Sequence, residues 1–248
     1  MTASLRERGI QAVLLDIEGT TTPIAFVYEV LFPFARKALR SYLRDHLDAP
    51  DLREPLRQLH EDWTHDLEHG APPPPWPDAP PDQRVDSVAA YVEWLMDRDR
   101  KASGLKALQG LIWADGYHDG ILHGDVFQDV PAAFARWSAA GIRLAIFSSG
   151  SVLAQQMLFR TTTSGDLTRW ITAYFDTSVG PKASADSYRR IATALRCPPE
   201  QILFVSDTAT ELTAARAAGC PVLMCRRPGN RDVPQADFET IDDFGEVR

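Results

Sequence analysis

The sequence predicts an α/β protein with a doubly wound parallel sheet that is interrupted by a helical insertion. Short apolar runs of strand length recur along the chain, and most of them end in polar residues that precede a helical stretch. Such alternation is typical of a parallel sheet covered by helices. About a hundred residues with helical periodicity separate the first apolar run from the rest. We therefore expect a sheet unit at 1–23 and 126–248 and a helical unit at 24–125.

The first predicted strand begins at Ala12, and Asp16 lies at its carboxyl end. An apolar run this short fits a strand that is buried on both faces. In open α/β sheets, ligands bind beyond the carboxyl ends of the strands. Asp16 and Glu18 leave the strand on the same side and can share one cation. The alternative is an ordinary helix start, with Thr20 as the cap and Glu18 as an acid that compensates the helix dipole.

The insertion is expected to contain four helices, at Ile24–Asp45, Asp51–His69, Arg84–Lys101 and Gly104–Ala114. A helical unit inserted at this point would cap the site, exclude water and select the substrate. The proline-rich segment 71–81 is interpreted as a stiff connector between two helices, and a polyproline ligand for a partner domain is the alternative.

Two groups of ring-bearing side chains in the insertion have a plain structural interpretation. His60, His65 and His69 recur at helix-like spacing without a thiol or a tight pair nearby, so a solvated helix face is preferred to a metal site. Trp113 and Tyr117 lie near the return to the sheet unit, where core packing explains them. Contact with a substrate is the alternative for these two.

The rest of the sheet unit alternates regularly between helices and strands. Helices are expected at Pro131–Ala140, from Val152, at Ser184–Leu195 and at Ala209–Ala218, and strands at Ile142–Phe147, Ala173–Phe175, Gln201–Ser206 and Val222–Cys225. The tail, 226–248, has no readable function and is expected to cover one edge of the sheet.

Polar residues follow the later strands as well. Ser148 and Ser149 precede a helix start, where hydroxyls and free N–H groups suit a phosphate oxygen. Lys182 lies just before another helix, where its charge can reach an anion. Asp207 adds a further carboxylate. Each residue alone could be a helix cap or a solvated side chain, but four such positions in one chain favour a shared site.

This order of carboxylate, hydroxyl, lysine and carboxylate resembles the haloacid-dehalogenase superfamily of phosphotransferases, which has a Rossmann-like core. Glu18 departs from the superfamily pattern, because most of its phosphatases carry aspartate at that position. With glutamate at this position, the sequence resembles the enolase-phosphatase E1 family, whose members are also called acireductone synthases. The segments that carry this resemblance are Asp16–Ile24, Val27–Phe34, Gln109–Trp113, Ser148–Ser151, Gly180–Ala183 and Ser206–Thr208.

The resemblance implies a reaction on 2,3-diketo-5-methylthiopentyl-1-phosphate: enolisation, followed by removal of the phosphate to give an acireductone in methionine salvage. Asp16 would be the nucleophile that forms an aspartyl-phosphate. The implied cofactor is Mg²⁺, held by Asp16, Glu18 and Asp207. The donor atom of Glu18 is either in its side chain or, as is usual at that position in the superfamily, its backbone carbonyl. Lys182 would stabilise charge on the phosphoryl oxygens, and Ser148 and Ser149 would position the phosphate.

Glu18 is the leading candidate for the general acid and base of the phosphatase step. For the enolisation, both Glu18 and a residue of the helical unit are candidates. Three other functions compete: a generic Mg²⁺-dependent phosphatase of a sugar or organic phosphate, a dehalogenase, and a non-catalytic binding module. Glu18 argues against the generic phosphatase. Glu18 and Asp207 together argue against a dehalogenase, which needs no metal. A binding module would be expected to have lost Asp16, Lys182 or Asp207, and all three are present.

Composition limits the partners. A formal net charge of −8 over 248 residues argues against a binder of nucleic-acid phosphates. No apolar stretch approaches the roughly eighteen residues of a membrane span, and the first eleven residues lack an apolar signal core. Three cysteines, Cys197, Cys220 and Cys225, fit reduced thiols. We therefore expect a cytoplasmic monomer that acts on a small phosphorylated molecule.

Overall fold

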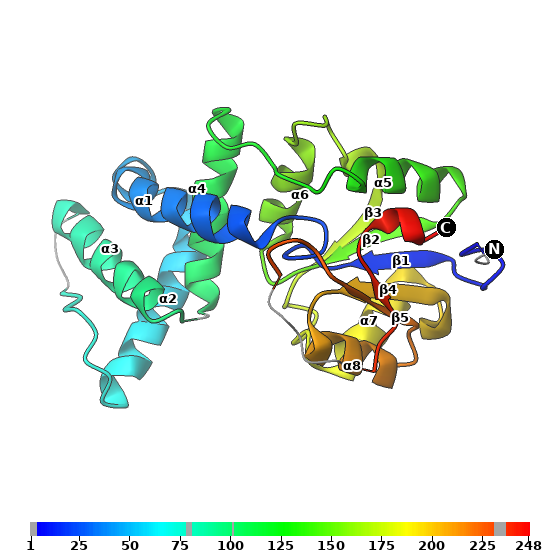
Figure 1. Ribbon diagram of the computed structural model, residues 1–248. Helices are drawn as coiled ribbons and strands as arrows, with labels where there is room; N and C mark the ends of the chain where they lie inside the picture. Colours follow the sequence, from blue (N-terminus) through cyan, green and yellow to red (C-terminus); the bar gives the residue numbers. More distant parts are fainter. Residues whose placement is uncertain (1–3, 78–80, 101, 231–236) are drawn as a thin grey trace. The chain divides into compact units, whose positions relative to one another are not determined.

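All neighbouring strands of the sheet are parallel, and their order is β3-β2-β1-β4-β5-β6 (Figure 1). This computed structural model describes residues 4–77, 81–100, 102–230 and 237–248. The strands are β1 (Ala12–Leu15), β2 (Arg143–Phe147), β3 (Ile171–Phe175), β4 (Ile202–Ser206), β5 (Val222–Cys225) and β6 (Thr240–Ile241). After β1, the chain adds β2 and β3 on one side of it and then β4, β5 and β6 on the other. The switch point, where α/β proteins bind ligands, therefore lies between β1 and β4.

Helices cover both faces of the sheet, as expected for a doubly wound fold. They are α5 (Val130–Ala139), α6 (Val152–Arg160), α7 (Ala185–Leu195) and α8 (Ala209–Ala217). Figure 1 shows α5 and α6 on one face and α7 and α8 on the other. Alternate strand residues such as Leu14 and Phe147 join Tyr188 and Ile191 of α7 and Leu212 of α8 in one buried cluster. The predicted fold class is thus confirmed.

The elements of the sheet unit lie close to their predicted positions. The strand predicted at 173–175 begins earlier, at Ile171, and the helix predicted at 131–140 begins at Val130. The expectation for the tail is also confirmed, because β6 pairs with the edge strand β5. Short 3₁₀ turns complete the described elements, at Pro50–Leu52, Thr168–Trp170, Pro199–Gln201 and Phe244–Glu246.

The helices of the insertion are α1 (Phe32–His46), α2 (Arg53–Glu68), α3 (Pro81–Asp97) and α4 (Ser103–His118). The helix predicted at 24–45 is instead divided into a π-helix, η1 (Phe26–Leu31), and α1. Gly104 allows α4 to approach α2, because a Cβ at this position would lie 2.7 Å from the carbonyl oxygen of Pro55. The chain divides into two units, 1–28 with 120–248 and 29–119.

The interior of the helical unit accounts for several residues discussed above. Trp113 is buried and donates its indole N–H to the carbonyl of Leu31 at 2.8 Å, as expected for core packing. Asp66 is also buried and accepts from the hydroxyl of Tyr91 at 2.8 Å and from Arg100 at 3.0 Å. His60 and His65 on α2, and His69 directly after it, are exposed, as expected for a solvated helix face.

The cysteines, the helix lengths and the proline-rich segment give three further results. Cys197, Cys220 and Cys225 are all free and buried, as predicted for reduced thiols. Within the part of the chain that the structure describes, no helix is both long and apolar enough to cross a bilayer. Residues 71–77 of the proline-rich segment follow α2, and the carbonyl of Pro74 accepts a hydrogen bond from Trp63 at 2.8 Å, whereas 78–80 lie outside the described residues.

Candidate active site

Asp16 lies at the switch point of the sheet, directly after β1. Its backbone N–H donates to the carbonyl of Val205 in β4, which extends the β1–β4 pairing by one residue. Ser148 follows β2 on one side of β1, and Asp207 follows β4 on the other. The parallel sheet therefore brings the ends of these three predicted segments to one edge.

The carboxylate of Asp16 is buried and fixed at both oxygens. Oδ1 accepts from the backbone N–H of Ile17 at 2.7 Å and from Nζ of Lys182 at 2.6 Å. Oδ2 lies 3.3 Å from the hydroxyl of Ser206, a longer contact. Oδ2 is therefore the oxygen with more lone-pair capacity left for another partner.

Lys182 connects two carboxylates from different parts of the chain. Its ammonium lies 2.6 Å from Asp16 and 2.7 Å from Glu211, and its side chain is 8% exposed. Burial alone would lower the pKa of Lys182, but the charges of Asp16 and Glu211 outweigh burial and raise it. The lysine is therefore charged, and its position is fixed by two ion pairs.

Glu211 is a site residue that sequence reasoning missed. It lies in the first turn of α8, and its Oε2 is 3.1 Å from the hydroxyl of Ser206. Burial, followed by the charge of Asp16, raises the pKa of Glu211, and the ion pair with Lys182 opposes that shift. The sequence did carry a signal for it, because Glu211 is an acid placed one helical turn after Asp207, which itself follows a predicted strand.

Asp207 lies against the turn that follows Asp16. A Cβ on Gly19 would be only 2.3 Å from Oδ2 of Asp207, so this turn and the carboxylate approach as closely as a glycine permits. The hydroxyl of Thr208 donates to Oδ1 of Asp207 at 2.9 Å. Burial, together with the nearby charge of Asp16, raises the pKa of Asp207 to about 6.

The charges at this site fit a divalent cation. One buried lysine faces the carboxylates of Asp16, Asp207 and Glu211, which leaves excess negative charge in a desolvated place. Within the described ranges, no group of three or more His, Cys, Asp or Glu side chains is arranged to hold a metal by itself. Mg²⁺ commonly uses only one or two carboxylates and completes its shell with waters and substrate oxygens, so these residues fit it.

The loop after Glu18 is held by the chain that follows β5. Asn230 donates its side-chain amide to the carbonyl of Gly19 at 2.9 Å, and Arg227 donates Nε to the carbonyl of Thr20 at 3.1 Å. No helix starts at Thr20, so the alternative interpretation of this residue as a helix cap is wrong. Arg227 was missed because the tail offered no pattern that points to the site.

The predicted phosphate-positioning residues lie at the end of β2. Ser148 is half-buried and its hydroxyl accepts from the N–H of Gly150 at 3.3 Å, whereas Ser149 is exposed. The cap of α6 is Ser151, which accepts from the N–H of Ala154. Helix capping is therefore not the role of Ser148 or Ser149, and the alternative interpretation of both as caps is wrong.

Comparison with known proteins identifies the family of this chain. The family model of haloacid dehalogenase-like hydrolases matches residues 10–219. The chain is 46% identical to enolase-phosphatase E1 of Synechococcus elongatus over 240 residues, which cover 96% of this chain and 98% of that protein. It is 43% identical to enolase-phosphatase E1 of Drosophila melanogaster, with coverages of 97% and 94%.

Solved structures share the fold of this chain. The UTR4 protein of Saccharomyces cerevisiae superposes with a TM-score of 0.74 at 30% identity, covering 96% of this chain and all of that one. CbbY of Rhodobacter sphaeroides, solved with phosphate, has a TM-score of 0.57 at 20% identity and shows only that the fold is shared. The chain belongs to the haloacid dehalogenase-like hydrolases and, within them, to the enolase-phosphatase E1 family.

Proposed function

We propose that this enzyme converts 2,3-diketo-5-methylthiopentyl-1-phosphate to 1,2-dihydroxy-3-keto-5-methylthiopentene and phosphate, by enolisation followed by dephosphorylation. The observation that carries the phosphatase step is the buried carboxylate of Asp16 at the switch point, with Lys182 2.6 Å away. The full-length similarity to enolase-phosphatase E1 proteins supports the choice of substrate.

In the phosphatase step, an oxygen of Asp16 attacks phosphorus while the bond from phosphorus to the substrate oxygen breaks. Attack by Oδ2 fits the hydrogen bonds best, because Oδ1 is already held by Ile17 and Lys182. A water molecule then attacks the aspartyl-phosphate, which releases phosphate and restores the carboxylate. Lys182 stabilises the negative charge on the phosphoryl oxygens, and Ser148 and Ser149 orient them.

Asp16 and Asp207 would hold Mg²⁺ through their side chains, and Glu18 through its backbone carbonyl. When bound, the ion offsets the charge on the transferring phosphoryl group. The excess of carboxylates over lysine at this site supports the assignment. Glu211 takes a different role, since its ion pair fixes the ammonium of Lys182 in front of Asp16.

Glu18 is proposed as the acid that protonates the leaving oxygen and as the base that later activates water. Its side chain is longer by one methylene than the aspartate of most superfamily phosphatases, and a shift near an ångström matters for proton transfer. For the enolisation, Glu18 and a residue of the helical unit remain the two candidates. That the helical unit caps the site, that the protein is a monomer, and that it is cytoplasmic stay predictions.

The experiment follows phosphate release and the near-ultraviolet absorbance of the enediol together, with the diketone phosphate as substrate. Both signals should appear with Mg²⁺ and disappear with EDTA, and Asp16→Asn should abolish phosphate release. If the diketone phosphate is untouched while simple phosphate esters are hydrolysed, the protein is a generic phosphatase and the proposed substrate is wrong.

A further inference from the structure

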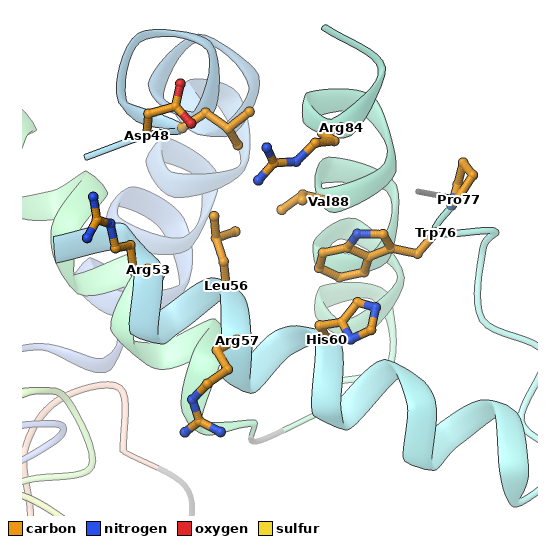
Figure 2. A pocket seen from close by; sticks show the side chains of 10 residues that line it. Asp48, Arg53, Leu56, Arg57, His60, Trp76, Pro77, Arg84 and Val88 are labelled. Atoms are coloured by element: carbon orange, nitrogen blue, oxygen red, sulfur yellow. The ribbon is translucent and has the colours of Figure 1, made fainter. Parts of the chain in front are cut away.

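We propose that a cavity within the helical unit binds a nucleoside monophosphate. The cavity has a volume of about 740 Å³, and its lining residues come from the segment directly after α1, from α2, from the connector and from α3 (Figure 2). All of them belong to the helical unit, so the proposal is independent of the proposed function. Small-molecule sites commonly occupy roughly 300–1,000 Å³, so the cavity is large enough for such a ligand.

Two of the three arginines that line this cavity form no ion pair with another described residue. Arg53 and Arg84 line it, and neither has an ion-pair partner among the described residues. Among the described lining residues, Asp48 is the one carboxylate. The side chain of Arg84 is half-buried and reaches toward Val88 and the middle of the cavity (Figure 2). Two guanidinium groups are thus available for an anion.

Arg57 also lines the cavity, but its charge is neutralised by two glutamates. Its guanidinium pairs with Glu54 at 2.5 Å and with Glu61, and Figure 2 shows it pointing away from Trp76. Arg36 and Arg40, elsewhere in the same unit, are likewise paired with carboxylates. Arg53 and Arg84 therefore differ from their neighbours in lacking such a partner.

Trp76 and His60 add aromatic rings to the lining, and Trp76 lies on the same side as Arg84 (Figure 2). The indole of Trp76 is half-buried and meets His60 edge to face, with ring centroids 5.3 Å apart. The segment that carries Trp76 is fixed by the hydrogen bond from Trp63 to Pro74. A planar base can stack against an indole, and such stacking contributes roughly 1–3 kcal/mol per base in nucleic-acid complexes.

A nucleoside monophosphate uses all three kinds of group in this cavity. Its phosphate suits the planar donors of Arg53 and Arg84. Its base suits the face of Trp76, and its ribose hydroxyls can donate to the carboxylate of Asp48. Inorganic phosphate would use the arginines alone, and a neutral nucleoside would use only the remaining groups. The intact nucleotide should therefore bind more tightly than either fragment.

The test is a calorimetric titration of the full-length protein with AMP, adenosine and inorganic phosphate, in EDTA and without Mg²⁺. We expect AMP to bind at least about tenfold more tightly than either fragment. Arg84→Gln and Arg53→Gln should each weaken AMP binding about tenfold, as expected for loss of a charged hydrogen bond, and Trp76→Leu should also weaken it. Arg57→Gln is the matched control and should change the affinity by less than about threefold.

Binding at the catalytic loops is the competing explanation, and Ser148→Ala distinguishes it. The proposal requires that Ser148→Ala binds AMP normally while Arg84→Gln does not, with circular dichroism showing that both variants are folded. The reverse pattern would overturn it. So would titrations in which AMP, GMP, CMP and UMP all fail to bind below about 1 mM, the weak end of the usual affinity range.

Discussion

Arg227 and Asp129 form a bidentate ion pair at the edge of the interior, with both guanidinium NH groups 2.9 Å from the carboxylate oxygens. The side chain of Arg227 is 3% exposed and lies between the rings of Phe127 and Phe244, 4.5 and 4.6 Å from their centroids. The same guanidinium donates to the carbonyl of Thr20. This pair therefore joins the C-terminal tail to the loop that follows the predicted nucleophile.

Breaking this pair should strongly destabilise the protein. Arg227→Ala leaves the partly buried carboxylate of Asp129, whose side chain is 23% exposed, without its cation. Loss of one partner of a fully buried pair costs about 3–5 kcal/mol of unfolding free energy, and we expect a loss of about 2–3 kcal/mol here because solvent screens part of the charge. Urea unfolding followed by circular dichroism measures the change. Arg189→Ala removes an exposed ion pair with Asp186 and should cost no more than about 1 kcal/mol. Equal losses in both variants would contradict a special role for Arg227.

Gly19→Ala should abolish phosphatase activity, because the added methyl group would lie 2.3 Å from Oδ2 of Asp207. Gly9→Ala is the matched control. Gly9 has a similar positive φ, +76° against +68°, but a Cβ there meets nothing within 4 Å. Both changes strain the backbone, and only one displaces the carboxylate. If kcat/KM falls equally in both variants, the close approach of Asp207 is not what the reaction needs.

Glu211→Gln should lower kcat while the protein stays folded, since Lys182 keeps its ion pair with Asp16 but loses the second carboxylate that fixes it. Lys182→Met should have the larger effect, a loss of about a hundredfold to a thousandfold in kcat, as found when one preorganised donor to a reacting oxygen is removed. Glu200→Gln changes an exposed acid and should leave the rate unchanged. The measurement is kcat from steady-state phosphate release. A kcat of Glu211→Gln equal to that of the Glu200→Gln control would contradict the role given to Glu211.

The three thiols should react slowly with Ellman's reagent in the native protein. Burial raises the pKa of Cys220 and of Cys225 to about 12, so both remain protonated and unreactive at pH 8. In guanidinium chloride, all three should react quickly, because exposed thiols have a pKa near about 8.5. Since the folded pKa values are the higher ones, the stability that these thiols contribute is lost as pH rises above about 9. Rapid native labelling would contradict their burial.

The sequence by itself determined the fold class and the positions of the strand ends. An apolar run bounded by turn residues indicates a buried strand. The position of β1, and of Asp16 at its end, could therefore be predicted from the sequence. Lys182 and Asp207 were found for the same reason, because each stands at a boundary between periodic segments. The family resemblance then assigned chemistry to them.

Only the tertiary structure decided which of these residues meet. Glu211 stands in an alanine-rich helix and looks like a surface acid, until the strand order places α8 beside Lys182. Arg227 is 98 residues from Asp129, and no local pattern relates the two. Strand order and long-range ion pairs depend on how the chain closes in space, whereas strand and helix signals depend on neighbours in sequence. For that reason the predicted nucleophile was readable in advance, and the residues that hold its surroundings in place were not.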